Sequence, residues 1–212
     1  MDKKIKIVAV TGPTATGKTA LAIRLAHQFN GEIISVDSRQ VYRHMDLGTG
    51  KDLHEYGEIP YHLIDVADPA RETYNLALFL RDAYQKIADI AGRGKLPVLC
   101  GGTALYLAAW LNNYQLPGAQ LPAREAGKAR EQQDGELPVS FAPPFCLEPL
   151  VLGVYYPRQT VHERIEVRLD ERISAGLVDE VRTLHEVYGV PLEKLDFFGL
   201  EYRECARFLR QE

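Results

Sequence analysis

Near-continuous apolar runs alternate along this chain with segments whose apolar side chains recur at the spacing of a helix. The runs predict buried strands, because a strand in a parallel sheet is covered by helices on both faces. They are residues 5–11, 32–36, 61–66, 96–100 and 150–155. Helical periodicity of about 3.6 residues separates them, for example at Leu76, Phe79, Leu80 and Ala83. The alternation predicts an α/β fold, a parallel sheet of about five strands with helices on both faces.

Local signals set the expected ends of these helices. Asn75 is a good N-cap, and Thr160 with Glu163 forms a capping box for a long helix. That helix should break and resume at Gly176, and a short last helix should follow Gly199.

One long stretch, from Gln115 to Pro149, follows neither pattern. Small and charged residues lie between its prolines, which are Pro117, Pro122, Pro138, Pro143, Pro144 and Pro149. Such composition predicts a flexible crossing and not a helix or strand. The remainder is consistent with a single domain over residues 1–212.

Composition narrows the class of protein. Of the 212 residues, 46% are hydrophobic and 25% are charged, as in a soluble globular domain. The formal net charge of -4 gives no global basic field, so any nucleic acid must be bound by a local patch. Cys100, Cys146 and Cys205 lie far apart and no secretory signal precedes them, which predicts reduced thiols in the cytosol. No apolar run approaches the roughly 18 residues of a membrane span, so we expect a cytoplasmic protein without membrane contact.

A complete match to the pattern G-x-x-x-x-G-K-[ST] follows the first strand. It consists of Gly12, Pro13, Thr14, Ala15, Thr16, Gly17, Lys18 and Thr19. The glycines let backbone N–H groups converge on an anion, and the following helix adds the positive end of its dipole. Lys18 supplies a point charge, and Thr19 a hydroxyl ligand for Mg²⁺. The motif predicts a nucleotide- or diphosphate-binding site in a P-loop NTPase-like fold, and taken alone it leaves a small-molecule kinase possible.

Two further polar segments end at the same predicted sheet edge. Asp37, Ser38, Arg39 and Gln40 follow the second strand, and Gly101, Gly102 and Thr103 follow the fourth. Ligands bind at the carboxyl ends of strands in open α/β sheets, so Asp37 should face the same crevice as Lys18. Its carboxylate would either hold Mg²⁺ through water or take a proton from an acceptor group. The alternative is an Asp that only caps the next turn.

Four arginines form a second cluster of candidates near the C-terminus. Arg164, Arg168 and Arg172 share one helix face at a spacing of four residues, and Arg158 precedes them. A helix placed over the phosphate loop would aim their guanidinium groups at a phosphate. A solvated face is equally consistent with the acidic residues among them, which are Glu163, Glu166, Asp170 and Glu171. The histidines are scattered and predict no metal or catalytic role, and Phe197 with Phe198 favours core packing over base stacking.

Several motifs agree in order and spacing with those of one protein family. They are the phosphate loop, Ser35–Arg43, Met45–Thr49, His62–Asp65, Gly101–Tyr106, Glu163–Ile165, Arg168–Asp170, Gly176–Leu177, Glu180–Val181 and Gly199–Glu204. In these the chain resembles the tRNA dimethylallyltransferases, over roughly its first 115 and last 60 residues. The resemblance implies that a dimethylallyl group moves from dimethylallyl diphosphate to the N6 amine of an adenine beside the anticodon of tRNA. It also implies Mg²⁺ as cofactor and no use of ATP.

The same resemblance implies a role for each candidate residue. Phosphate-loop residues 12–19 would bind the diphosphate together with Arg158 and Arg168, and Lys18 and Arg164 would stabilise its departure. Asp37 would accept the N6 proton and Thr103 would position the reacting groups. Ser38, Arg39 and Gln40 would contact an adenine flipped out of its stack, beside Asp37 and Thr103.

Two segments of the family pattern are absent from this sequence. The Pro-rich stretch 115–149 stands where the family carries a helical insertion that grips the anticodon stem, and the chain ends at Glu212 without the family's basic tail. Three hypotheses therefore remain for a protein that we expect to be a monomer. They are prenyl transfer to tRNA, prenyl transfer to free AMP or ADP, and a non-catalytic protein that binds a nucleotide or diphosphate.

Overall fold

Five strands form one sheet in the computed structural model, which describes residues 4–111 and 145–212. The strands are β1 (Lys4–Thr11), β2 (Gly31–Ser35), β3 (Tyr61–His62), β4 (Leu96–Gly101) and β5 (Cys146–Gly153). Their order across the sheet is β3-β2-β4-β1-β5, and neighbouring strands pair in parallel throughout. The predicted parallel sheet of about five strands is confirmed.

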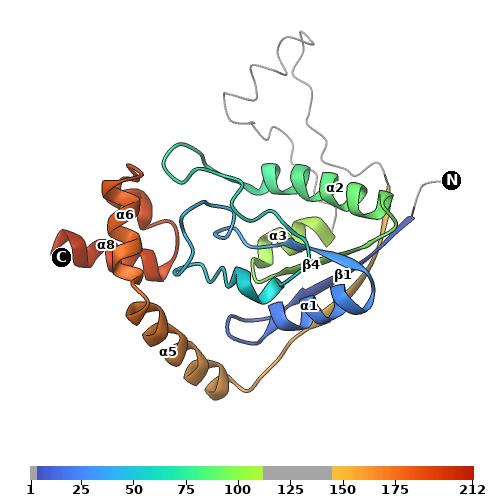
Figure 1. Cartoon of the computed structure of the whole chain (residues 1–212), viewed down its shortest axis with the longest axis horizontal. Helices are drawn as coiled ribbons and strands as arrows, with labels where there is room; N and C mark the ends of the chain where they lie inside the picture. The colour runs from blue at the N-terminus through green and yellow to red at the C-terminus, as the bar shows by residue number, and fades with distance from the viewer. Residues whose placement is uncertain (1–3, 112–144) are drawn as a thin grey trace, which may run out of the picture.

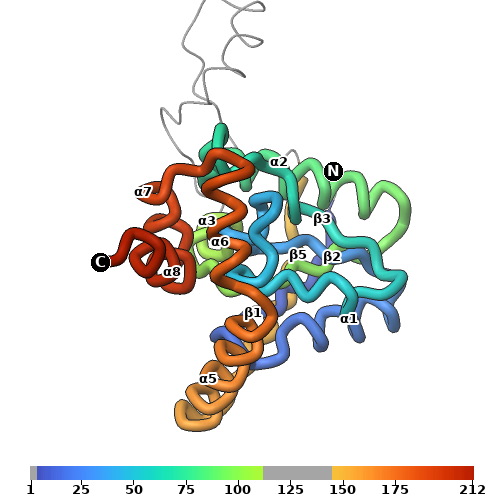
Figure 2. Tube along the Cα trace, turned by 60° about the vertical axis from the view of Figure 1, so that its left-hand side comes forward, coloured from blue at the N-terminus to red at the C-terminus, as the bar shows by residue number. Residues whose placement is uncertain are grey.

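Helices cover both faces of this sheet (Figure 2). α1 (Lys18–Gln28) and the 3-10 helix η1 (Leu53–Tyr56) pack on one face, while α2 (Leu76–Gly92) and α3 (Ala104–Leu111) pack on the other. Alternate residues of a strand point to opposite faces, so Val98 of β4 joins the core under α1 and Leu99 joins the core under α2. The predicted N-cap holds: the Asn75 side chain accepts a hydrogen bond from the Leu78 N–H.

The C-terminal helices form a group beside the sheet (Figure 1). They are α5 (Arg158–Ser174), α6 (Leu177–Glu186), α7 (Leu192–Leu195) and α8 (Leu200–Arg210). α6 and α8 pack with residues 41–45 around the fully buried Tyr202. α5 connects β5 to this group and buries only Val161, so most of its surface is free to line a site. Gly176, at φ 101°, separates α5 from α6 as predicted.

Two expected elements differ in the structure. The third strand was expected over residues 61–66 but ends at His62, because Leu63 and Asp65 take positive φ values of 63° and 57°. The left-handed region breaks the extended backbone that a ladder needs. The capping box at Thr160 is also wrong, because α5 starts at Arg158 behind Pro157 and its N-terminus has no side-chain cap.

The limits of the Pro-rich stretch also need correction. Its last residues belong to β5, where Pro149 pairs with Ile7. Proline is tolerated there because β5 lies at the edge of the sheet and needs donors on one side only. The rest of the expected crossing, residues 115–144, lies outside the described residues. In the part of the chain that the structure covers, no helix has the length and apolar character needed to cross a membrane.

Candidate active site

The loop between β1 and α1 folds tightly back on itself. Gly12 has φ 152°, and a Cβ at this position would lie 2.5 Å from the carbonyl oxygen of Val154, so only glycine fits. The Thr16 hydroxyl donates to the Pro13 carbonyl oxygen at 2.8 Å, and Lys18 Nζ donates to the same oxygen at 2.6 Å. The lysine side chain therefore covers the loop and holds a position from which it can reach a bound anion.

The backbone of this loop has unused donors. Within the described residues, the N–H groups of Thr14 to Gly17 donate to no backbone carbonyl. Gly17, at φ 77°, leads directly into the first turn of α1. Free N–H groups at the start of a helix, together with its dipole, favour binding of an anion.

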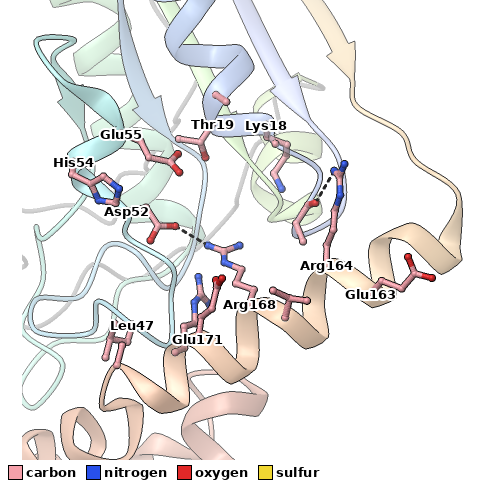
Figure 3. A pocket seen from close by; sticks show the side chains of 16 residues that line it. Lys18, Thr19, Leu47, Asp52, His54, Glu55, Glu163, Arg164, Arg168 and Glu171 are labelled. Carbon is pink, nitrogen blue, oxygen red and sulfur yellow. Dashed lines mark hydrogen bonds and ion pairs between the residues drawn. The ribbon is translucent and has the colours of Figure 1, made fainter.

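A cavity of about 790 Å³ lies between the loop and α5 (Figure 3). Lys18 and Thr19 line it on one side, and Arg164, Arg168 and Arg172 line it on the other. The spacing of four residues in α5 thus places all three arginines over the phosphate loop, as one of the two hypotheses from the sequence required. Acidic side chains reach the same cavity from the segment before and within η1, namely Asp52 and Glu55.

Each arginine of α5 has a different environment. Arg164 Nη1 lies 3.5 Å from the Ala15 carbonyl oxygen, and its guanidinium lies 4.2 Å above the ring of Tyr156. Arg168 pairs with Asp52 at 3.1 Å, as Figure 3 shows. Arg172 Nη2 is buried and has no hydrogen-bond partner among the described residues.

Arg158, expected at the diphosphate, does not line the cavity. Its Nε contacts His162 Nε2 at 3.4 Å on the exposed surface of α5. Arg164 lies six positions further along α5, which is a rotation of about 240° around the helix axis, so the two side chains point in different directions.

Asp37 and Thr103 lie together at the carboxyl ends of β2 and β4. Asp37 Oδ1 accepts from the N–H of Arg39 at 2.8 Å and of Gln40 at 3.3 Å, which is the predicted turn-capping alternative. Thr103 Oγ1 accepts from the Ser38 N–H at 3.1 Å. These bonds fix both side chains at the sheet edge, and the turn uses only one oxygen of the Asp37 carboxylate.

Burial and a nearby carboxylate both act on the pKa of Lys18. Burial lowers this pKa, and the carboxylate of Asp37 acts in the opposite direction. Burial raises the pKa of Cys100 to about 11, so this thiol stays neutral near the loop. That Asp37 faces the bound substrate together with Lys18 stays a prediction.

Sequence reasoning missed how the segment Asp46–Lys51 is held. One carboxylate, that of Glu180 in α6, accepts from the N–H groups of Asp46, Leu47 and Gly48 at 2.8 to 3.2 Å and from the Tyr202 hydroxyl at 2.7 Å. Since Glu180 lies more than a hundred positions from this segment, no local pattern could reveal the contact.

Gln40 also holds the segment Asp46–Lys51, by hydrogen bonds to its backbone. Its Nε2 donates to the carbonyl oxygens of Thr49 and Gly50, and its Oε1 accepts from the Ser35 hydroxyl. The buried Lys51 donates to the carboxylates of Asp46 and Asp65. Gln40, expected to contact an adenine, thus has its amide engaged in holding the wall of the cavity.

Comparisons with known proteins identify a consistent set of relatives. A family model described as IPP transferase matches residues 40–142 and 138–212, and one described as isopentenyl transferase matches residues 5–58. The tRNA dimethylallyltransferase 2 of Trichlorobacter lovleyi is 42% identical, over 97% of this chain and 79% of its own. The tRNA dimethylallyltransferase 1 of Geotalea daltonii is also 42% identical, over 97% of this chain and 78% of its own.

Solved structures agree with these sequences. The tRNA isopentenylpyrophosphate transferase of Staphylococcus epidermidis is similar with a TM-score of 0.75 and 26% identity, covering 98% of this chain and 81% of its own. The corresponding transferase of Bacillus halodurans has a TM-score of 0.69 and 28% identity, covering 100% of this chain and 85% of its own.

Proposed function

This chain belongs to the family of tRNA dimethylallyltransferases, and from that premise we propose that its cavity performs the transfer. A dimethylallyl group moves from dimethylallyl diphosphate to the N6 amine of an adenine beside the anticodon of tRNA. The observation that supports this assignment of the site is the geometry of the cavity, in which a phosphate loop faces three arginines while Asp37 lies near Lys18.

The diphosphate is held and stabilised by cations on two sides. The free N–H groups of residues 14–17 bind phosphate oxygens, and Lys18 exchanges its bond with the Pro13 carbonyl for one with the donor. Arg164 and Arg168 approach from α5. As the bond between C1 and its oxygen breaks, negative charge grows on the diphosphate, and these fixed positive groups stabilise it.

The acceptor amine loses its proton to Asp37. Oδ1 of Asp37 is committed to the turn, whereas Oδ2 has no hydrogen bond within the described residues and is left to accept. The N6–C1 bond forms as the C1–O bond breaks, and the proton passes from N6 to Asp37. The N–H groups of Arg39 and Gln40 hold this carboxylate in place. Thr103, bonded to the Ser38 N–H, positions the reacting groups, and Ser38 and Arg39 contact the adenine.

Mg²⁺ fits this site as a partner of the diphosphate. Among the described residues, no group of three or more His, Cys, Asp or Glu side chains forms a metal cage. Mg²⁺ typically keeps several waters and binds through phosphate oxygens with one or two protein ligands. Thr19 would hold it, with Asp52 and Glu55 on the same cavity, and the ion would neutralise charge on the diphosphate.

The experiment is a transfer assay with mass spectrometry. The protein is incubated with dimethylallyl diphosphate, Mg²⁺ and unmodified tRNA, and the digested tRNA is searched for N6-dimethylallyl adenosine. A tRNA with guanosine at the modified position is the control. Parallel incubations with AMP and ADP identify a free-nucleotide acceptor, and an ATP-consumption assay identifies a kinase. Two outcomes would contradict the proposal: prenylated product from AMP but not from tRNA, or no prenylated product with any of the acceptors.

Two properties of the protein accompany this proposal. We expect the enzyme to act in the cytoplasm, where unmodified tRNA is available. We also expect it to act as a monomer, because the cavity is formed by elements of one chain. Light scattering of the purified protein at assay concentration tests the second expectation.

A further inference from the structure

Arg172 is a cation at the site that lacks an acid partner. Its Nη2 is buried, and no acceptor among the described residues lies within hydrogen-bond distance of it. It forms no ion pair in that part of the chain, in contrast to Arg168, which pairs with Asp52. Burial, followed by the proximity of Arg168, lowers the pKa of Arg172. A buried donor without an acceptor costs free energy, so the position calls for an explanation.

The backbone at Gly50 provides the space that Arg172 occupies. A Cβ at this glycine would lie 2.2 Å from Nη2 of Arg172 and 2.2 Å from Nη2 of Arg168. Both guanidinium groups therefore lie directly against the Gly50 backbone. Any residue larger than glycine would push them away.

This part of the backbone is not free to move aside. The Gln40 amide donates to the Gly50 carbonyl oxygen at 3.1 Å, and Glu180 fixes the backbone two residues earlier, at Gly48. Gly48 itself packs against the ring of Tyr202, within 2.5 Å of where a Cβ would stand. The backbone from Gly48 to Gly50 is thus held by hydrogen bonds from Gln40 and to Glu180, and Arg172 stays beside Arg168.

Arg172 lines the cavity that Lys18 and Thr19 also line. Together with Arg168 it also lines a second, neighbouring cavity of about 360 Å³. A cation with an unused donor, beside a second guanidinium and opposite a phosphate loop, matches the chemistry of a phosphate oxygen.

We propose that Arg172 is a donor-binding residue, and that with Arg168 it holds phosphate oxygens of the dimethylallyl diphosphate. This inference rests on the proposed function. When the anion binds, the Arg172 guanidinium turns its unused N–H groups from the Gly50 backbone to the phosphate oxygens. The anion also removes the repulsion between the two arginines, and Arg168 exchanges Asp52 for phosphate. The Arg172 side chain thus lowers the stability of the free protein and raises its affinity for the diphosphate.

The test compares Arg172→Met with the control Arg182→Met, which removes an exposed arginine of α6 that pairs with Asp179. Thermal unfolding is followed with and without inorganic diphosphate and Mg²⁺. We expect R172M to raise Tm of the free protein by about 2 to 4 °C, since a buried unpaired charge is removed. The diphosphate-induced rise in Tm should shrink, corresponding to about tenfold weaker binding. R172K should fall between wild type and R172M.

Steady-state kinetics identify which phosphate is held. KM for the donor should rise about tenfold in R172M, while KM for tRNA stays within twofold. A lower Tm with unchanged diphosphate affinity would overturn the proposal in favour of a structural role. A rise in KM for tRNA alone would overturn it in favour of a phosphate of the tRNA backbone.

Failure of the proposed function would be recognised separately. Diphosphate binding needs no turnover, so loss of affinity in R172M supports this inference even if wild type fails to modify tRNA. Active wild-type enzyme with an R172M variant of unchanged affinity would refute the inference and leave the function intact.

Discussion

At the amino end of the sheet a carboxylate is buried among cations, whereas at the carboxyl end two of the cations, Lys18 and Arg172, form no ion pair within the described residues. Glu32, exposed by only 2%, receives hydrogen bonds from Nη1 and Nη2 of Arg93, from Lys95 at 2.8 Å and from His62 at 2.8 Å. Lys18 donates only to a carbonyl oxygen, and Arg172 has an unused donor within the described residues.

The difference separates structural charges from functional ones. Removing a charge from water is costly, and partners at Glu32 offset that cost inside the chain. Lys18 and Arg172 at the carboxyl end have no such ion-pair partner within the described residues, which favours a ligand that brings negative charge with it. A buried charge whose ion-pair partners belong to the chain, as at Glu32, therefore indicates a role in stability. A buried charge without such partners indicates a binding site.

Lys18→Ala should have the largest effect. It removes the cation that faces the departing diphosphate, so kcat/KM should fall about 10⁴-fold, through rate and donor affinity together. Tm should not fall, because no acid partner is left behind. Steady-state kinetics and thermal unfolding measure these effects, and Lys6→Ala on the exposed side of β1 is the control. A drop in Tm with intact kinetics would place Lys18 in the framework.

Asp37→Asn examines the carboxylate that we propose as the proton acceptor. Without a proton acceptor, kcat should fall about 10³-fold, while diphosphate affinity stays within a few-fold, because the asparagine oxygen can still cap the turn. Single-turnover rates and diphosphate titration separate the two quantities. A large loss of diphosphate affinity would instead indicate a role for Asp37 in holding the metal.

Elements that depend on contiguous residues could be predicted from the sequence. The phosphate loop is an eight-residue pattern between β1 and α1, and the break at Gly176 needs only one glycine at the end of an apolar period. The face shared by Arg164, Arg168 and Arg172 follows from helix geometry, and the structure places it over the loop.

Features that depend on distant contacts could not be predicted. β3 stops early because Asp65 donates to the Gln40 carbonyl and bonds to Lys51, contacts that local propensity does not encode. The contacts of Glu180 with the Asp46–Gly48 backbone join two motifs that the sequence shows only as separate matches. The role of Gly50 became visible only once both guanidinium groups were placed against it.

Glu32→Gln tests whether the buried carboxylate at the amino end of the sheet stabilises the fold. The partners of Glu32 lower its pKa far below the ordinary 4.5, so its stabilisation is complete above pH 4.5 and is lost as pH falls further. We expect E32Q to lose about 2 to 3 kcal/mol of unfolding free energy at pH 7, and less near pH 3. Urea unfolding across this pH range measures it.

The controls for Glu32 concern surface charge and activity. Glu186→Gln, at an exposed position of α6, should leave the unfolding free energy unchanged. Activity of E32Q should change less than twofold, because the β4 segment between Pro97 and Gly101 keeps the two ends about 13 Å apart. Stability of E32Q equal to wild type would mean that the buried cluster is not a framework element.

Gly50→Ala should have the smallest effect, because it moves the guanidinium groups of Arg168 and Arg172 without removing a charge. The new methyl group would displace the guanidinium groups of Arg168 and Arg172, so donor KM should rise about tenfold. Part of any stability loss comes from placing alanine at φ 68°, which costs about 1 kcal/mol. Gly189→Ala is the matched control, since Gly189 has φ 69° and open space around its Cβ position. If the two variants lose the same stability and only G50A loses donor affinity, the displaced arginines account for the difference. Equal donor KM in both would show that the position of these guanidinium groups against Gly50 has no part in binding.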